Sequence, residues 1–537
     1  MTRTPLASRS PRALAVALLA AISIPVAAQT SHQPAVQAQL TRLDASTRTG
    51  PFRANWDSLG AYRVPGWFRD AKFGIFIHWG VYSVPAFGNE WYSRNMYVQG
   101  NPAFLHQVAT YGPQSKFGYK DFIPMFRAEH FDADAWLDLF VRAGARYVVP
   151  VAEHCDGFAM YDSRLTDWDA AKMGPHRDVV GELAAATRRR GLHFGVSSHR
   201  AEHWWWYGAG MTFDSDVRDP RFAGLYGPAE PMGLPGDDPA KEPDPDHLER
   251  WLPPDKTFLD NWLARSGELV EKYHPDFLYF DWWIGQPAFQ PYLQRFAAYY
   301  YNQAAQRHQG VVLTYKGYDF PENAAVLDIE RGKLDTLRLL PWQTDTSVSI
   351  HSWGYVENDQ YRDAKSLIDE LVDVVSKNGN LLLNVGPKSD GTIPEQARAI
   401  LLQIGAWLKT NGEAIYGSRP WLVYGEGPTK VTSSAKNSDR QEFTAQDIRF
   451  TTHNGALYAI ALGWPASGDL RIRSLARGLP YLQGPVCQIT LLGSTGKIPF
   501  RQLGDGLHIS LPAQPPDEPA YTFRIMEPQD HSARCGN

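Results

Sequence analysis

The sequence predicts an α/β protein: a (β/α)8, TIM-like barrel followed by a C-terminal antiparallel β-sandwich. Short apolar runs alternate with longer amphipathic stretches from Trp67 onward, which is typical of parallel strands covered by helices. Ionisable residues recur where these apolar runs end, and barrel active sites are built at the carboxyl ends of the strands. After residue 412 the helical pattern gives way to short alternating runs, as in a sandwich.

Eight apolar runs are expected to form the barrel strands. In chain order they are KFGIFIHWG ending at His78, RYVVPVAEH at His154, LHFGVSSHR at His199, FLYFDWW with Asp281, VVLTYKGY with Lys316, AVLDIERG near Glu330, PWQTDTSV with Asp345 and NLLLNVGP near Asn384. Helices are expected at 132–144, 177–190, 258–272 and 361–378. The alternative is an open doubly wound sheet, but no Gly-rich phosphate loop follows the first strand.

Residues 1–28 have the pattern of a secretory signal peptide. Three arginines precede a short apolar stretch, Ala13 to Ile24, and the small residues Val26-Ala27-Ala28 place the cleavage before Gln29. We therefore expect an exported protein, periplasmic or secreted, with no membrane span after cleavage. The remaining chain is divided into an irregular segment at 29–60, the barrel at 61–412 and the sandwich at 413–537.

Composition narrows the functional classes. The 537 residues carry a formal net charge of only -5, and no basic face indicates nucleic-acid binding. Three cysteines, Cys155, Cys487 and Cys535, are too few for a disulfide scaffold, although a Cys487–Cys535 bridge is conceivable. Aromatic residues make up 13% of the chain, including 18 tryptophans, and such rings suit the apolar face of a sugar.

The ionisable residues at the strand ends favour glycoside hydrolysis. A retaining glycosidase needs one carboxylate as nucleophile and a second carboxyl as acid and base, and Asp281 and Glu330 fit these roles. Asp328, Glu322 and Asp345 compete for the second role, and ion pairs are the structural alternative for both acids. His78, His154 and Asp156 could share a metal, but no HExxH pair is present. No G-x-S-x-G elbow is found.

Three motifs resemble the α-L-fucosidases of glycoside hydrolase family 29. They are AKFGIFIHWGVYSVPAFGNEWYSRNM near the first strand, NGNLLLNVGPKSDGTIPEQ at the eighth and SWGY at 352–355. The resemblance covers about residues 60–425. It implies a barrel with a C-terminal sandwich, retention of configuration, a fucosylated oligosaccharide or glycoconjugate as substrate, and no cofactor. From the residues themselves, no metal is expected either.

The resemblance also implies roles for individual residues. Asp281 falls at the nucleophile and Glu330 near the acid/base of some members. The expected sugar contacts are His78, the pair Glu90 and Trp91, and His154, the first His of the family's His-His-Asp-Gly-Phe stretch. Apart from the resemblance, Trp283 is expected to form pocket wall, because it follows Asp281 in an aromatic run.

Two departures from the family pattern concern the pocket. Cys155 replaces the second His of that stretch, and we expect it to shape the pocket rather than to act as a nucleophile. Ser197-Ser198-His199 stands where Tyr-Tyr-Ser is frequent, so His199, Arg200 and Glu202 are expected to rebuild one side. Such changes resemble the branch that prefers α-1,3/1,4-linked fucose. The alternatives are a related exo-glycosidase, such as an α-L-galactosidase, and a catalytically inactive carbohydrate-binding protein.

Overall fold

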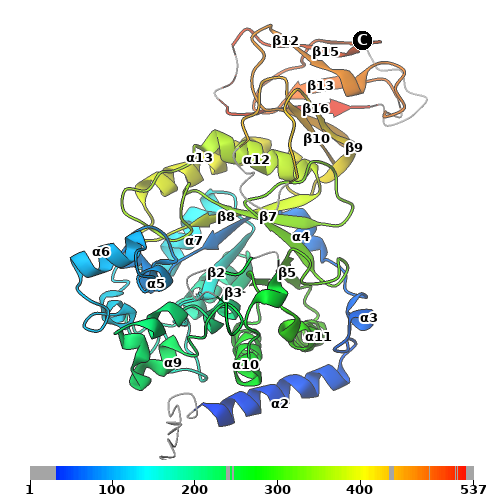
Figure 1. The fold of residues 1–537 in the computed structure, drawn as a ribbon. Helices are drawn as coiled ribbons and strands as arrows, with labels where there is room; N and C mark the ends of the chain where they lie inside the picture. Colours follow the sequence, from blue (N-terminus) through cyan, green and yellow to red (C-terminus); the bar gives the residue numbers. More distant parts are fainter. Residues whose placement is uncertain are drawn as a thin grey trace, which may run out of the picture.

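A closed barrel of eight parallel strands forms the centre of the molecule in this computed structural model (Figure 1). The structure describes residues 32–237, 242–244, 247–433, 441–482, 484–514, 516 and 518–527. The strands are β1 Phe73–Ile77, β2 Tyr147–Glu153, β3 His193–Ser198, β4 Phe277–Phe280, β5 Val312–Lys316, β6 Val326–Glu330, β7 Trp342–Ser347 and β8 Gly379–Val385. Each strand pairs with the next, and β8 closes on β1. The predicted barrel and all eight strands are confirmed.

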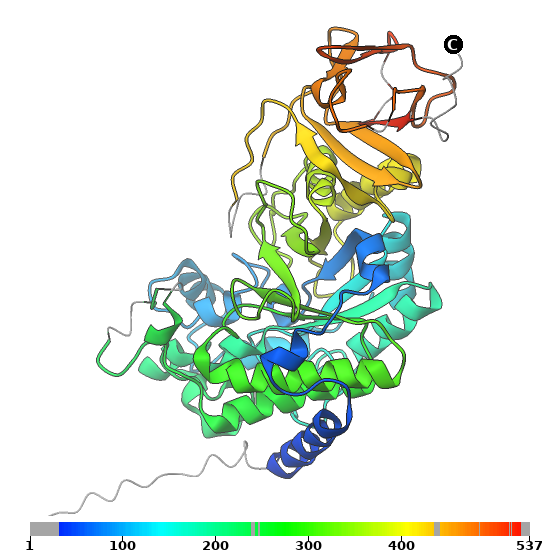
Figure 2. The same cartoon turned by 90° about the vertical axis from the view of Figure 1, so that its right-hand side faces the viewer.

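Helices surround the barrel (Figure 2). The longer ones are α7 Ala133–Arg142, α8 Val179–Arg189, α10 Lys256–Tyr273, α11 Gln290–Gln306, α12 Ala364–Ser376 and α13 Glu395–Asn411. Side-chain caps define several starts: Asp132 accepts from two backbone N–H groups of α7, and Asp255 accepts from Phe258 N at 2.8 Å. The four predicted helices are confirmed with ends shifted by a few residues.

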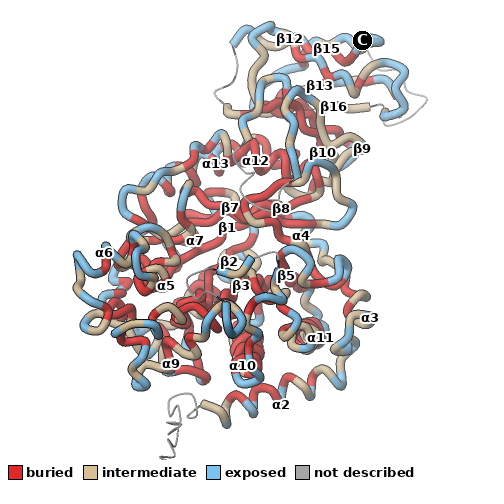
Figure 3. The backbone as a smooth tube through the Cα atoms, in the orientation of Figure 1, coloured by how far each residue is buried: buried red, intermediate tan, exposed pale blue. Residues whose placement is uncertain are grey.

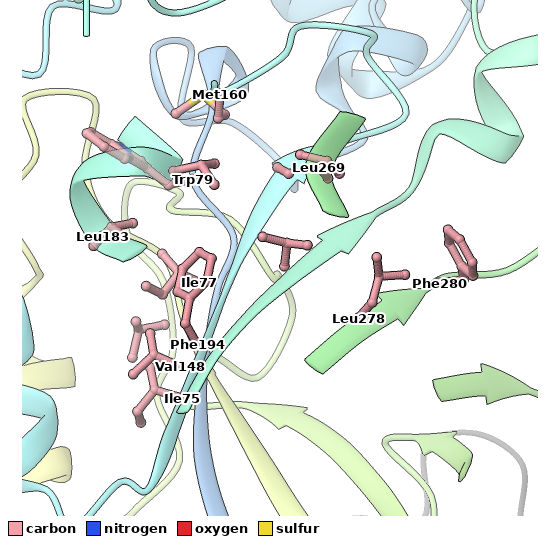
Figure 4. Close-up of a cluster of buried hydrophobic side chains, with 14 of the residues drawn as sticks. Ile75, Ile77, Trp79, Val148, Met160, Leu183, Phe194, Leu269, Leu278 and Phe280 are labelled. Atoms are coloured by element: carbon pink, nitrogen blue, oxygen red, sulfur yellow. The ribbon is translucent and has the colours of Figure 1, made fainter. Parts of the chain in front are cut away.

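The strands bury both of their faces (Figure 3). Residues such as Phe76, Val149 and Phe277 fill the barrel interior. Alternate residues point outward to the helices, and Figure 4 shows Ile75, Val148, Phe194 and Leu278 in the same cluster as Leu183 of α8 and Leu269 of α10. A parallel sheet buried on both faces is continuously apolar, which explains the runs seen in the sequence.

The segment 29–60, expected to be irregular, instead contains helix α2, Gln33–Thr49, and the short helix α3, Trp56–Leu59. Val36, Leu40 and Leu43 form one buried stripe of α2, which lies along α10 and α11 (Figure 1). These residues have helical spacing, but the mostly polar composition hides the stripe. The predicted signal peptide at 1–28 lies outside the described residues.

Two long insertions, at 83–125 after β1 and at 200–256 after β3, carry short helices. The first contains α5 Tyr92–Asn95, α6 Pro102–Thr110 and the 3₁₀ helix η2 Tyr119–Met125, and the second begins with the 3₁₀ helix η3 Arg200–Trp204 and includes α9 Ala223–Tyr226. In the described part of the chain, no helix combines the length and apolar character needed to cross a membrane.

The C-terminal region consists of two antiparallel sheets, as predicted. Their strand orders are β13-β16-β11-β10-β9 and β12-β15-β14. The bounds are β9 Arg419–Glu426, β10 Ile448–His453, β11 Ala456–Ala461, β12 Asp469–Ile472, β13 Gln488–Leu491, β14 Phe500–Leu503, β15 Gly506–Ser510 and β16 Tyr521–Met526. A tight hairpin at His453-Asn454-Gly455 joins β10 to β11, with Asn454 and Gly455 both at positive φ.

Buried polar contacts join this region to the barrel helices. Arg449 of β10 pairs with Asp373 of α12 at 2.6 Å, and the indole of Trp407 in α13 donates to the carbonyl of Ala520 at 2.9 Å. Cys487 is disulfide-bonded, whereas Cys155 is free. Cys535, the partner considered for Cys487, lies outside the described residues.

Candidate active site

A cavity of about 610 Å³ opens at the carboxyl ends of the barrel strands. Of the predicted site residues, Cys155 and Arg200 do not line it. Cys155 hydrogen-bonds to the lining residue Glu202, whereas the expected role of Arg200 in the pocket is not met, because its guanidinium pairs with the buried Glu153 at 2.5 Å. The predicted members of the lining are His78, Glu90, Trp91, His154, His199, Glu202, Asp281, Trp283 and Glu330. They come from segments spread over 250 residues, which the closed barrel brings together.

Asp281 follows β4 directly and is held as an anion. Nδ1 of His199 donates to its Oδ2 at 2.7 Å, and the hydroxyl of Tyr279 lies 3.4 Å from Oδ1. Burial raises the pKa of Asp281, but the charge and hydrogen bond of His199, with Lys316 behind them, outweigh burial and hold the pKa below its usual range. The side chain is 18% exposed, so the carboxylate remains open to the cavity.

Three histidines stand next to this carboxylate. His78 bonds through Nδ1 to Oδ1 of Asn384 at 2.8 Å, His199 bonds through Nε2 to the Ser197 hydroxyl at 3.0 Å, and Nδ1 of His154 has no partner among the described residues. Burial, with the neighbouring His199, lowers the pKa of both His78 and His154, so these rings are neutral. Neutral imidazoles can both donate to and accept from sugar hydroxyls.

In the described segments, these three rings form a group of side chains whose possible ligand atoms lie close enough together to hold a metal ion. One ring nitrogen from each of His78, His154 and His199 lies within 4.8 Å of the others. Asp156, the other ligand considered from the sequence, is instead engaged by the hydroxyl of Tyr119 at 2.6 Å and by the backbone N–H of Phe158. His199 also hydrogen-bonds to Asp281, and His78 hydrogen-bonds to Asn384. The three rings are therefore part of the hydrogen-bonded wall of the pocket.

Glu330 ends β6 and faces the same cavity. Its Oε2 accepts from the indole N–H of Trp282 and lies 3.7 Å from the ammonium of Lys316, and its side chain is 21% exposed. The guanidinium of the adjacent Arg331 lies 4.7 Å from the centroid of the Trp353 ring. The competitors Asp328 and Glu322 do not line the cavity, whereas Asp345 does.

Lys316 is the centre of a buried charge cluster below the cavity. Its ammonium lies 2.9 Å from Asp328 and 3.3 Å from both oxygens of Asp345. Burial lowers the pKa of Lys316, but these carboxylates outweigh burial and raise it. Burial and the charge of Asp328 raise the pKa of Asp345 well above its usual value, while Lys316 opposes the rise.

Glu90 anchors the wall opposite these acids. Its Oε2 accepts from the backbone N–H of Trp353 at 2.8 Å and from the hydroxyl of Ser352 at 3.1 Å, which ties the SWGY loop to the first insertion. Trp353 packs 5.2 Å from the His78 ring. Burial raises the pKa of Glu90, although these hydrogen bonds to the carboxylate oppose the rise.

Tryptophans form the outer wall of the cavity. Trp205 lies 6.3 Å from Trp91, 5.4 Å from Trp251 and 6.3 Å from Trp283, measured between ring centroids. The guanidinium of Arg94 lies 5.5 Å from the Trp91 and Trp205 rings, in the range of a cation–π contact. Trp283 adopts φ +79, a left-handed conformation that is costly for a bulky residue.

Several lining residues were not among those predicted. They are Tyr279, Trp282, Asp345, Trp353, Trp205, Glu242, Pro243, Leu248 and Trp251. The strand-end pattern pointed to Asp345 and Lys316, and the aromatic richness of the insertions pointed to the tryptophans. No sequence signal distinguishes Trp205 from its neighbours Trp204 and Trp206.

Comparisons with known proteins agree with this arrangement. The sequence profile of the α-L-fucosidases matches residues 39–413, and that of the α-L-fucosidase C-terminal domain matches residues 440–526. The tissue α-L-fucosidase of Rattus norvegicus is 32% identical over 89% of this chain and 93% of its own length. The human plasma α-L-fucosidase is 31% identical over 86% of this chain and 88% of its own length.

Solved structures show the same relationship. The α-fucosidase of Thermotoga maritima superimposes with a TM-score of 0.70 at 30% identity, covering 88% of this chain and all of that one. The same enzyme in complex with fucose gives a TM-score of 0.69. With the barrel, the convergent acids and these matches, the chain belongs to the α-L-fucosidases of glycoside hydrolase family 29.

Proposed function

We propose that the protein removes terminal α-L-fucosyl residues from glycans by double displacement, with Asp281 as nucleophile and Glu330 as acid/base. The observation that carries this proposal is the anionic Asp281, oriented by His199 in a cavity that Glu330 shares. A carboxylate nucleophile must be ionised, and the low pKa of Asp281 meets that need.

The two steps follow from these positions. Asp281 attacks the anomeric carbon while Glu330 gives its proton to the departing glycosidic oxygen, so the glycosidic bond breaks as the fucosyl–aspartyl bond forms. Glu330 then takes a proton from water, which attacks the anomeric carbon and releases Asp281. Two inversions at one carbon retain the configuration. His78, His154, Glu90 and Trp91 are proposed to hold the sugar.

The test is turnover of nitrophenyl α-L-fucoside. The wild type should hydrolyse it, and Asp281→Ala should lose activity by about 10⁴-fold or more, as for other removed nucleophiles. Azide added to that variant should restore turnover and yield the product of inverted configuration. Turnover of the α-L-galactoside in preference to the fucoside would replace this function with that of an α-L-galactosidase, and no turnover of either would favour a binding protein.

We also propose that the enzyme belongs to the branch that prefers α-1,3/1,4-linked fucose, which is supported by Cys155, His199 and Glu202 at one side of the pocket. Hydrolysis rates of α-1,2-, α-1,3- and α-1,4-linked fucosyl oligosaccharides test this preference. Faster cleavage of the α-1,2 linkage would contradict it.

We propose further that the protein is exported, on the basis of the arginines and apolar stretch of residues 1–28. N-terminal sequencing of protein recovered from the periplasm or medium should begin at Gln29. Full-length protein retained in the cytoplasm would contradict export.

A further inference from the structure

Besides Asp281 and Glu330, the carboxyl group of Glu202 lines the cavity, on the side where the sequence departs from the family pattern. Glu202 lies in η3, directly after β3, and is 8% exposed. Its Oε2 accepts from the thiol of Cys155 at 3.2 Å. Within the described segments, its Oε1 has no hydrogen-bond partner and is left for whatever occupies the cavity.

The charges around Glu202 disfavour its ionised form. Asp281 and Glu330 lie across the cavity and repel a negative charge, and the guanidinium of Arg94, the cation on this side, is engaged by Glu242 at 2.5 Å. Burial, followed by the charges of Asp281 and Glu330, raises the pKa of Glu202 to about 8, while Cys155 and Arg94 oppose the rise. A carboxyl group in this setting is a neutral acid at pH 7.

The hydrogen bond from Cys155 determines which oxygen of the Glu202 carboxyl group carries the acidic hydrogen. Burial, then the charge of Glu202, raises the pKa of the Cys155 thiol well above its usual value, so the sulfur keeps its hydrogen and donates it to Oε2. The acidic hydrogen of Glu202 is therefore free to reside on Oε1. Glu202, oriented by Cys155, therefore presents one O–H donor to the cavity, at Oε1.

We propose that Glu202 is a specificity-determining residue that donates a hydrogen bond from Oε1 to an oxygen of the bound sugar, with Cys155 as the residue that orients it. This inference rests on the proposed function, because the ligand is the sugar that Asp281 attacks. Glu330 keeps the acid/base role, and Glu202 keeps its proton throughout the reaction. A neutral donor suits a cavity that already contains the carboxyl groups of Asp281 and Glu330, since a further carboxylate beside them would repel the oxygen lone pairs of the substrate.

The test is a pH profile of kcat/KM for nitrophenyl α-L-fucoside with the wild type, Glu202→Gln and Glu202→Leu. Above about pH 8 the wild type should lose activity about tenfold per pH unit, because the donor ionises. Glu202→Gln keeps a neutral donor, so it should retain most of the activity at pH 7 and lack this alkaline decline. Glu202→Leu should lose about ten- to a hundredfold at every pH.

Two further measurements test the contact with the sugar and the protonation of Glu202 without relying on turnover. Affinity for L-fucose, measured by calorimetry, should fall above pH 8 in the wild type and stay constant in Glu202→Gln, which reports contact without turnover. The infrared band of a protonated carboxyl should be stronger in the wild type than in Glu202→Gln at pH 6, and this difference should vanish at pH 10.

Three results would overturn the proposal: an unchanged alkaline decline in Glu202→Gln, wild-type activity in Glu202→Leu, or a Glu202→Gln variant whose lost activity returns with azide. The last would make Glu202 the proton donor of the reaction. Failure of the wild type on every fucoside would instead overturn the proposed function.

Discussion

Asp281 and His199 form a 2.7 Å hydrogen bond between Oδ2 and Nδ1, although 82 residues separate them in the chain. His199 directly follows β3 and Asp281 directly follows β4, and these two strands are neighbours in the barrel. The contact orients the carboxylate and stabilises its ionised form.

Replacing His199 should move the acidic limb of the pH–activity profile. His199 lowers the pKa of Asp281, so His199→Phe should raise that pKa, and activity should be lost at a higher pH as the medium is acidified. Each unit of displacement lowers kcat/KM about tenfold on the acidic side of the limb. The measurement is kcat/KM for nitrophenyl α-L-fucoside between pH 4 and 8.

His193→Phe is the matched control, because His193 begins the same strand at the opposite end of the barrel. Its profile should coincide with that of the wild type. An acidic limb that stays in place in His199→Phe would show that His199 does not set the ionisation of Asp281.

Removing the ammonium of Lys316 should destabilise the barrel. Lys316→Met leaves Asp328 and Asp345 buried without their cation, and breaking a buried pair in this way costs about 3–5 kcal/mol. The free energy of unfolding in urea measures the loss. Lys256→Met, which removes an exposed ammonium from Asp260, should change stability by less than about 1 kcal/mol. Similar losses in the free energy of unfolding of the two variants would show that burial does not make the Lys316 ion pairs more important for stability than an exposed pair.

Cys155 should be chemically inert and replaceable. The thiol is 1% exposed and its pKa is raised by burial, so iodoacetamide should label it only after unfolding. Cys155→Ser keeps a donor to Glu202 and should retain most of the activity, whereas Cys155→Ala should lower it by about two- to tenfold through the lost hydrogen bond. Mass spectrometry and nitrophenyl fucoside assays give the two readouts. Abolished hydrolysis in a folded Cys155→Ser variant would point to a covalent role.

The left-handed backbone at Trp283 should reverse the usual ranking of Ala and Gly. Trp283→Gly and Trp283→Ala both remove the ring, but only Gly relieves the positive φ, so the Gly variant should be more stable by about 1 kcal/mol. At Trp251, where φ is -86, the Ala variant should be the more stable of the pair by about 0.5–1 kcal/mol. Thermal unfolding of the four variants measures both differences, and the same ranking at both positions would contradict the strain at Trp283.

The barrel was predictable because its strands are buried on both faces and therefore appear as unbroken apolar runs. Helix α2 was missed for the opposite reason: its buried apolar residues are Val36, Leu40 and Leu43 alone, a narrow stripe within a polar segment. In the site, the strand-end acids were identifiable, since any barrel gathers them at one face. Trp205 and Trp251 were not, because their inward orientation depends on how the long irregular insertion between β3 and α10 folds.

The sequence by itself determined the fold class, the position of Asp281 at the mouth of the barrel and the set of residues that could surround it. It could not assign protonation states, because the pKa of a carboxyl group depends on burial and on charges contributed by distant segments. Asp281 and Glu202 have similar intrinsic acidity, yet His199 holds the first ionised, while burial and two facing acids keep the second protonated. Only the closed barrel, by placing β2, β3, β4 and β6 around one cavity, decides which acid carries the charge.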